Sequence, residues 1–103
     1  MNQFGERIKQ LREQKGLLQR QVANQLEMDK LILSKIERGE RNAKREQVTI
    51  LSKIFNVPED DLLSLWLADK VYHMGKYENV ALKVLSVTEE ELKINPKRKK
   101  SKK

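Results

Sequence analysis

The sequence predicts an all-α protein with one small helical domain and a C-terminal helical extension. Apolar residues recur at spacings of three and four along most of the chain, and no segment shows the alternation of a strand. Glycine, proline or a capping residue lies between the periodic segments, where helices end or begin. With 103 residues, the chain can form one modest core but not two independently stable ones. We therefore expect about five helices in the domain.

The first two helices are each marked by a stripe of apolar residues at helical spacing. The stripe of the first helix consists of Phe4, Ile8 and Leu11. The stripe of the second helix is narrower and consists of Val22, Ala23 and Leu26. Gly16 supplies the stop between them, because glycine ends helices readily.

The third helix is expected to start near Lys30, because the Asp29 carboxylate can accept hydrogen bonds from the exposed N–H groups there. Its inward side consists of Ile32, Leu33 and Ile36, and its outward side of Lys30, Leu31, Ser34, Lys35 and Arg38. Gly39 can adopt the left-handed conformation that ends a helix. The second and third helices thus fit a pair that crosses at a steep angle, and the third offers a cationic face to an outside partner.

A fourth helix is predicted at residues 45–55, and Pro58 ends it because proline disfavours a helical residue before it. A fifth helix begins at Pro58, and the acidic residues of its first turn interact favourably with the helix dipole. From Leu62 onward its apolar residues exceed the single stripe that a surface helix needs. Part of this helix is therefore expected to contact a partner.

Gly75 is expected to mark a turn, and two more helices follow it. Thr88 and Glu91 are spaced like a capping box at the start of the last one. From residue 95 onward the chain is lysine-rich without an apolar residue, and it is expected to be disordered. These boundaries divide the chain into a domain at 1–63, a helical extension at 64–94 and a basic tail at 95–103.

The composition argues against catalysis, a metal site and a membrane location. There are no cysteines, and His73 is the only histidine, so acid–base and metal-binding sites lack their usual residues. No apolar run approaches the roughly 18 residues that span a bilayer, and the N-terminus lacks the layout of a secretion signal. We therefore expect a cytoplasmic protein that is not an enzyme and uses no cofactor and no metal.

The net charge of +7 is unevenly distributed. Residues 1–57 are net basic, residues 58–96 are net acidic, and residues 97–103 carry only basic charges. A basic half that faces phosphates and an acidic region that faces solvent or a partner subunit would explain this pattern. The expected partner of the basic half is double-stranded DNA. The tail either adds salt-sensitive attraction to DNA or serves only as a solubilising end.

Residues 4 to about 63 resemble the helix-turn-helix domain of the lambda-repressor-like (XRE) family of bacterial and phage regulators. The resemblance rests on Ile8, Leu11, Arg12, Gly16, Gln19, Val22, Ala23, Leu26, the segment 34–39, Leu51, Val57, Asp61 and Leu62. The chain departs from the family at two positions. Leu18 stands where relatives usually have a capping threonine, and Glu27 stands where glycine usually makes the turn. The missing cap is expected to cost on the order of 1 kcal/mol, and the non-glycine residue in the turn about 1–2 kcal/mol.

The resemblance implies a role for each of three groups of residues. Base contacts fall on Lys30, Leu31, Ser34 and Lys35, and phosphate contacts fall on Gln19, Arg38, Arg41, Asn42 and Lys44. Arg12 and Glu37 match a structural pair that bridges the first and third helices. The implied protein is a sequence-specific transcriptional regulator, acting as a repressor, which binds a pseudo-palindromic operator as a homodimer.

Relatives that dimerise through a C-terminal helical hairpin suggest where the homodimer would form. By this analogy the dimer interface is expected at Leu65, Trp66, Val71 and Tyr72. An alternative comes from another class of protein. The acidic and apolar C-terminal half could bind and neutralise another protein, as in toxin–antitoxin pairs, and the sequence does not identify such a partner.

Overall fold

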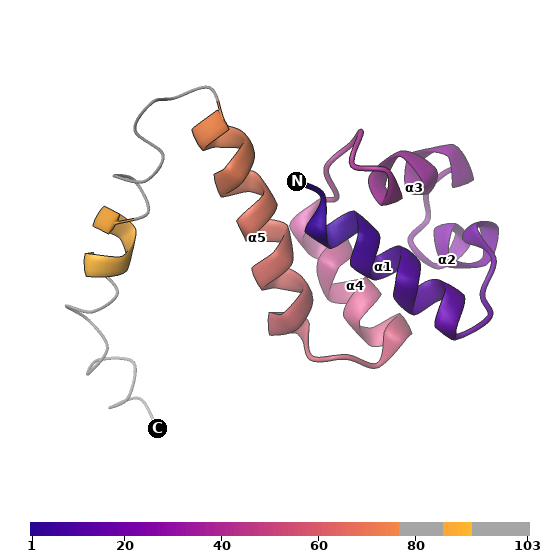
Figure 1. Cartoon of the computed structure of the whole chain (residues 1–103). Coiled ribbons are helices and arrows are strands. Elements are labelled where there is room, and N and C mark those ends of the chain that lie inside the picture. The colour runs from indigo at the N-terminus through magenta and orange to yellow at the C-terminus, as the bar shows by residue number, and fades with distance from the viewer. Residues whose placement is uncertain (77–85, 92–103) are drawn as a thin grey trace. The chain divides into compact units, whose positions relative to one another are not determined.

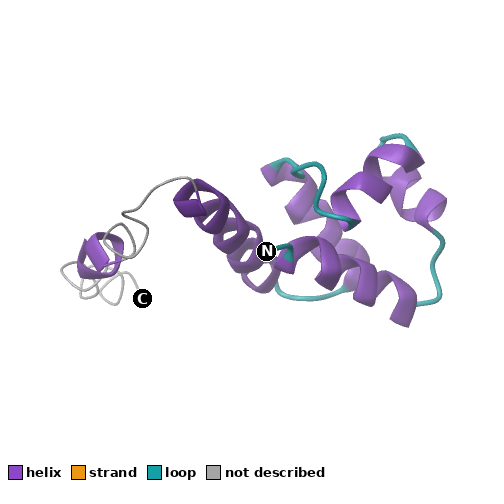
Figure 2. Ribbon diagram, turned by 45° about the horizontal axis from the view of Figure 1, so that its top comes forward, coloured by secondary structure: helices purple, strands orange, loops and turns teal. Residues whose placement is uncertain are grey.

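The computed structural model describes residues 1–76 and 86–91, and in these ranges the chain is helical without a strand (Figures 1 and 2). The helices of the first range are α1 (Gln3–Gln14), α2 (Gln19–Gln25), α3 (Lys30–Glu37), α4 (Arg45–Phe55) and α5 (Glu59–Lys76). A short helix covers residues 86–91. Every helix in these two ranges is too short or too polar to traverse a bilayer. The all-α class is thus confirmed.

The chain divides into two compact units, Met1–Lys70 and Val71–Lys103, and the division falls inside α5. Two expectations about the second unit are wrong. Gly75 lies within α5 and makes no turn, since one glycine costs a helix only about 1 kcal/mol relative to alanine. Thr88 lies inside the helix at 86–91 and so cannot be its N-cap. The helix expected within residues 77–85 and the tail at 95–103 lie outside the described residues.

The helices α1 to α4 all end with one residue in the left-handed conformation. These residues are Gly16, Glu27, Gly39 and Asn56, with φ of 68°, 55°, 79° and 54°. After each of them, the next N–H donates to the carbonyl five residues earlier, at 3.0 Å from Leu17 to Arg12, 3.0 Å from Met28 to Ala23, 2.8 Å from Glu40 to Lys35 and 3.0 Å from Val57 to Ser52. This bonding satisfies carbonyls that a helix end leaves unpaired and turns the chain sharply.

Two of the helices begin without a capping side chain. Leu18 precedes α2 and Lys44 precedes α4, and neither side chain can accept a hydrogen bond from the helix. Instead, the side chain of Gln21 accepts from the Leu18 N–H at 2.7 Å, and that of Gln47 accepts from the Lys44 N–H at 2.8 Å. This is half of a capping box. It offsets part of the loss from the missing threonine at position 18.

The core of the first unit takes apolar side chains from all five helices and from the loop before α4. It consists of Phe4, Ile8, Leu11, Val22, Ala23, Leu26, Leu33, Ile36, Ala43, Val48, Leu51, Phe55 and Leu62. The helix α1 packs against both α3 and α4, and α2 packs against α3. Because α3 is covered on these sides, only its outer side is left to face a partner (Figure 1).

A carboxylate of α5 holds the beginning of α1. Asp69 is buried, and its two oxygens accept hydrogen bonds from the backbone N–H groups of Gln3 at 2.9 Å and Phe4 at 2.8 Å. The first N–H groups of a helix have no partner within the helix and attract negative charge. Asp69 therefore satisfies two of these donors from a position far along the chain. Sequence reasoning did not identify this contact.

Candidate nucleic-acid interface

The candidate interface is the outer side of α3. Its inner side is fixed, because Leu33 and Ile36 are buried in the core. The predicted base-contact residues lie on the other side, where Lys30 and Leu31 are exposed while Ser34 and Lys35 are half-buried. Leu31 keeps 56% of its surface accessible. The helix therefore presents both cationic and apolar groups outward.

The start of α3 is held by Asp29, whose carboxylate accepts a hydrogen bond from the Leu31 N–H at 3.1 Å. The turn before it contains Glu27 in the left-handed conformation. The turn thus keeps the geometry expected from the resemblance although the residue is not glycine. This costs about 1–2 kcal/mol, since the left-handed conformation crowds a β-carbon.

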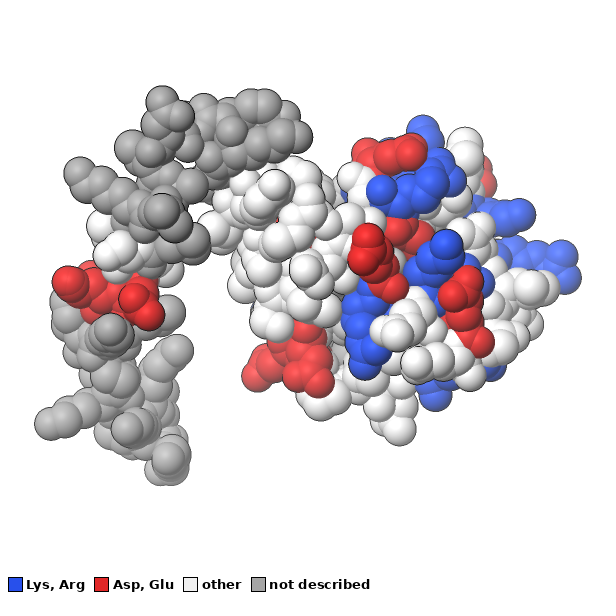
Figure 3. Space-filling model, in the orientation of Figure 1, with Lys and Arg blue, Asp and Glu red and all other residues white. Residues whose placement is uncertain are grey.

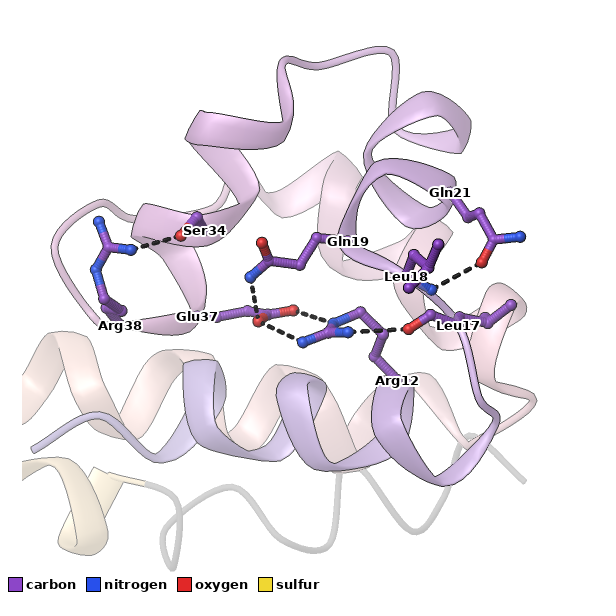
Figure 4. Close-up of polar contacts among 8 residues, drawn as sticks. All are labelled: Arg12, Leu17, Leu18, Gln19, Gln21, Ser34, Glu37 and Arg38. Carbon is purple, nitrogen blue, oxygen red and sulfur yellow. Dashed lines mark hydrogen bonds and ion pairs between the residues drawn. The ribbon is translucent and has the colours of Figure 1, made fainter.

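The far end of α3 is locked by a buried network centred on Glu37 (Figure 4). Arg12 of α1 donates to Glu37 from Nε at 2.7 Å and from Nη2 at 3.1 Å, and Arg12 Nη1 also donates to the Leu17 carbonyl at 2.9 Å. Both residues of the ion pair are buried. The hydrogen bond from Arg12 to Glu37 raises the pKa of the guanidinium above its ordinary value. The pair fixes α3 against α1.

Gln19, the first residue of α2, joins the same network. Its Nε2 donates to Glu37 at 2.9 Å (Figure 4). The side chain thus braces α3 from α2. An amide nitrogen carries two hydrogens, so the bond to Glu37 uses one of its two donors. Contact between Gln19 and a phosphate stays a prediction.

The basic loop, residues 39–44, follows α3 and carries most of the predicted phosphate contacts. Arg41, Asn42 and Lys44 are all exposed. Ala43 is the exception, with 3% of its surface accessible. Exposed arginine, lysine and asparagine side chains can donate to phosphate oxygens without a large loss of hydration. The loop therefore has the composition and exposure of a backbone-contacting segment.

Arg38, another predicted phosphate contact, is engaged within the chain. Its guanidinium donates to Glu40 from Nε at 2.9 Å and from Nη2 at 3.2 Å, and Nη1 donates to the hydroxyl of Ser34 (Figure 4). The hydrogen bonding between Arg38 and Glu40 raises the pKa of Arg38 and lowers that of Glu40. Sequence reasoning missed this pair, although opposite charges two residues apart in a turn were a visible signal. These bonds use three of the five N–H donors of the guanidinium, and the Ser34 hydroxyl accepts here.

The residues predicted for a dimer interface fall into two groups. Leu65 and Trp66 are partly buried and pack against the core of their own unit. Val71 and Tyr72 are exposed, at 37% and 48% of their surface. Trp66 also donates from its indole nitrogen to the Ala43 carbonyl at 2.8 Å, a contact that no sequence pattern predicts. Leu65 and Trp66 thus serve the packing of α5 onto the domain.

Charged side chains are unevenly placed on the surface. Figure 3 shows lysine and arginine gathered over the part of the molecule that holds α1 to α4, with acidic side chains among them. The visible side of α5 is uncharged except at its lower end, where Glu59, Asp60 and Asp61 form its first turn. Within residues 1–76 and 86–91, no group of histidine, aspartate and glutamate side chains could hold a metal ion.

Comparisons with known proteins show which family the chain is similar to. Residues 3–65 match the model of the helix-turn-helix domain family. The chain is also similar to the HTH-type transcriptional activator BcrR of Enterococcus faecalis, with 40% identity over 62 residues, which is 60% of this chain and 30% of that protein. The chain therefore spans less than a third of the length of this relative. No solved structure matches the chain significantly.

Proposed function

The chain belongs to the helix-turn-helix domain family, and we propose that it is a transcription regulator that reads double-stranded DNA with the outer side of α3. The observation that supports this most is the contrast between the two sides of α3. One side is locked by Glu37 and the core, while the other exposes Lys30 and Leu31. A rigid helix with free donors and one apolar side chain can enter the major groove and contact base edges there.

The proposal assigns base contacts to Lys30, Leu31, Ser34 and Lys35. Lysine can donate to guanine O6 and N7, serine can bond with several bases, and leucine can contact a thymine methyl group. Phosphate contacts are assigned to Gln19, Arg38, Arg41, Asn42 and Lys44, which would set register and affinity without sequence preference.

Two substitutions test this division of roles. Lys35→Ala should relax the preference at one base position, at a cost of about 1–3 kcal/mol on the best site. Arg41→Ala should weaken matched and scrambled duplexes alike and reduce the salt slope by about one. Lys53→Ala is the matched control, because Lys53 is an exposed lysine of α4 outside α3 and the basic loop. Dissociation constants are measured by fluorescence anisotropy over a salt series.

The sites for these measurements come from selection of bound sequences out of a random duplex pool. Enrichment of one motif would support sequence-specific binding, whereas no enrichment, together with equal affinity for all duplexes, would contradict it. If Lys35→Ala and Arg41→Ala behave alike on matched and scrambled sites, the assignment of roles is wrong.

We further propose that the protein acts as a homodimer through α5. Support comes from the exposed apolar residues Val71 and Tyr72, to which Leu67 and Met74 add further exposed apolar surface on the same helix. A two-fold dimer would place two copies of α3 on half-sites about 34 Å apart, so the selected motif should be a pseudo-palindrome. Analytical ultracentrifugation of wild type and Val71→Lys tests this. A monomeric wild type, or a dimer that Val71→Lys leaves intact, would contradict this interface.

We propose repression as the outcome, because a bound dimer that overlaps a promoter blocks polymerase without any further contact. The relative named as an activator matches this chain over 62 residues, which are 30% of its own length, so its mode of action need not carry over. Transcription in vitro from the selected promoter should fall as protein is added. A rise would identify an activator. Purification of a stoichiometric foreign protein, with no binding to DNA, would favour the protein-interaction alternative.

A further inference from the structure

The basic loop is bonded to α3 through Glu40 and to α4 through Lys44, and one residue between these two, Ala43, is buried. Ala43 is buried, whereas its neighbours Asn42 and Lys44 are exposed. The side chain of Ala43 lies in the core. The path of the loop backbone between α3 and α4 therefore depends on how Ala43 is held.

Trp66 of α5 provides the polar contact to this residue. Its indole Nε1–H donates to the Ala43 carbonyl at 2.8 Å, across 23 positions of sequence. A buried carbonyl without a hydrogen-bond donor costs free energy of folding. The bond from Trp66 therefore favours the backbone path that keeps the Ala43 carbonyl paired. The bond joins α5 to Ala43 in the basic loop, whose other residues are exposed.

Trp66 is itself held in place from two sides. The ammonium group of Lys70 lies over its ring, 4.4 Å from the centroid. On the same helix, Leu62 is buried one turn earlier and Asp69 bonds to the start of α1 three residues later. These contacts leave the indole little freedom. Its N–H can therefore serve as a fixed point for the loop.

We propose that Trp66 is a positioning residue for DNA binding, which holds the Ala43 carbonyl so that the basic loop presents Arg41, Asn42 and Lys44 to phosphates. This inference rests on the proposed function. A loop already held in its binding conformation loses less conformational entropy when the phosphates are bound. Trp66 touches no DNA in this account and acts only through the backbone of residues 42–44.

The test is Trp66→Phe, which keeps an aromatic ring against the core and removes the N–H donor together with part of the bulk of the indole. Binding to the selected duplex and to a scrambled duplex should weaken equally, by about fivefold, which corresponds to about 1 kcal/mol. The preference between the two duplexes should not change. In the double variant Trp66→Phe/Arg41→Ala, the loss should be smaller than the product of the two single losses, because both act on the same phosphate contacts.

A control variant that is destabilised at another position distinguishes a purely structural role of Trp66 from a positioning role. Ile54→Val removes a methyl group from a partly buried residue of α4 and should lower the melting temperature without changing DNA affinity well below it. If Trp66→Phe behaves like Ile54→Val, or if its effect multiplies fully with that of Arg41→Ala, the inference is overturned. Specific binding by the wild type would then still support the proposed function.

A second variant covers the case in which Trp66→Phe does not fold. Ala43→Gly leaves Trp66 intact and gives the loop backbone more freedom at the point of attachment. It should weaken both duplexes equally, and unchanged affinity for both would overturn the inference. Failure of the wild type to prefer any duplex would instead refute the proposed function itself.

Discussion

Replacement of Glu37 by alanine is the most informative perturbation of this domain. The Glu37 side chain keeps only 2% of its surface accessible and accepts three hydrogen bonds, two from Arg12 and one from Gln19. Glu37→Ala leaves the guanidinium facing a small void, where the Leu17 carbonyl is its remaining acceptor in the network. Removal of one partner of a buried ion pair costs about 3–5 kcal/mol, because the other charge stays desolvated.

That loss is large for a domain of this size, whose free energy of unfolding is expected to be about 5–15 kcal/mol. The double variant Arg12→Met/Glu37→Leu removes both charges and fills the space with apolar groups, so it should be much less destabilised than Glu37→Ala alone. The difference measures the cost of an unpaired buried charge rather than the strength of the pair. Urea unfolding at neutral pH, followed by far-UV circular dichroism, gives both values if the m-value stays constant.

The reasoning would be refuted by either of two results. A loss below about 1 kcal/mol for Glu37→Ala would mean that the charge finds water or another partner. Equal losses in the single and double variants would mean that packing, and not the unpaired arginine, sets the cost.

Four further predictions concern three single positions. Glu27→Gly should raise the free energy of unfolding by about 0.5–1 kcal/mol in urea, because glycine adopts the left-handed conformation without strain but has more freedom when unfolded. Asp69→Ala should lower it by about 1–2 kcal/mol in the same assay, because the first N–H groups of α1 lose their acceptor. Arg38 lowers the pKa of Glu40, so the ion pair persists as pH falls until that lowered pKa is reached, as an NMR titration of the carboxylate would show. Glu40→Gln should free Arg38 for phosphate and steepen the salt dependence of DNA binding by about one.

Each of these has a clear contrary result. A less stable Glu27→Gly would show that the Glu27 side chain contributes more than its backbone strain costs. An unchanged Asp69→Ala would show that water replaces the carboxylate at α1. A Glu40 that titrates at the ordinary value, or a Glu40→Gln variant with unchanged salt dependence, would show that the pair with Arg38 does not persist in solution.

Local signals were enough to predict the helices of the first unit. The carboxylate of Asp29 and the glycines at 16 and 39 act on the nearest turn of backbone, so their effect can be inferred from neighbouring residues. The same reasoning failed at Gly75, where a glycine signal without a left-handed backbone left α5 unbroken.

Contacts across long stretches of sequence could not be predicted in the same way. No spacing rule connects Trp66 to Ala43 or Asp69 to Phe4, because these pairs form only when α5 is docked. Trp66 is an example: an aromatic residue in an apolar stretch suggests an interface, but only the three-dimensional structure shows which surface it contacts. The outward direction of Lys30 was predictable, since helical periodicity sets it once the buried side is known.

The hydrogen bonds that Trp66 and Asp69 make to other segments start three positions apart on α5, which is about 4.5 Å along its axis. They end on separate segments, the loop after α3 and the beginning of α1. A rotation of α5 about its own axis would stretch the bonds of Trp66 and Asp69 together, and a slide along the axis would do the same. A displacement of α5 should therefore be felt at the Ala43 carbonyl and at the α1 terminus as well as at Leu62 in the core.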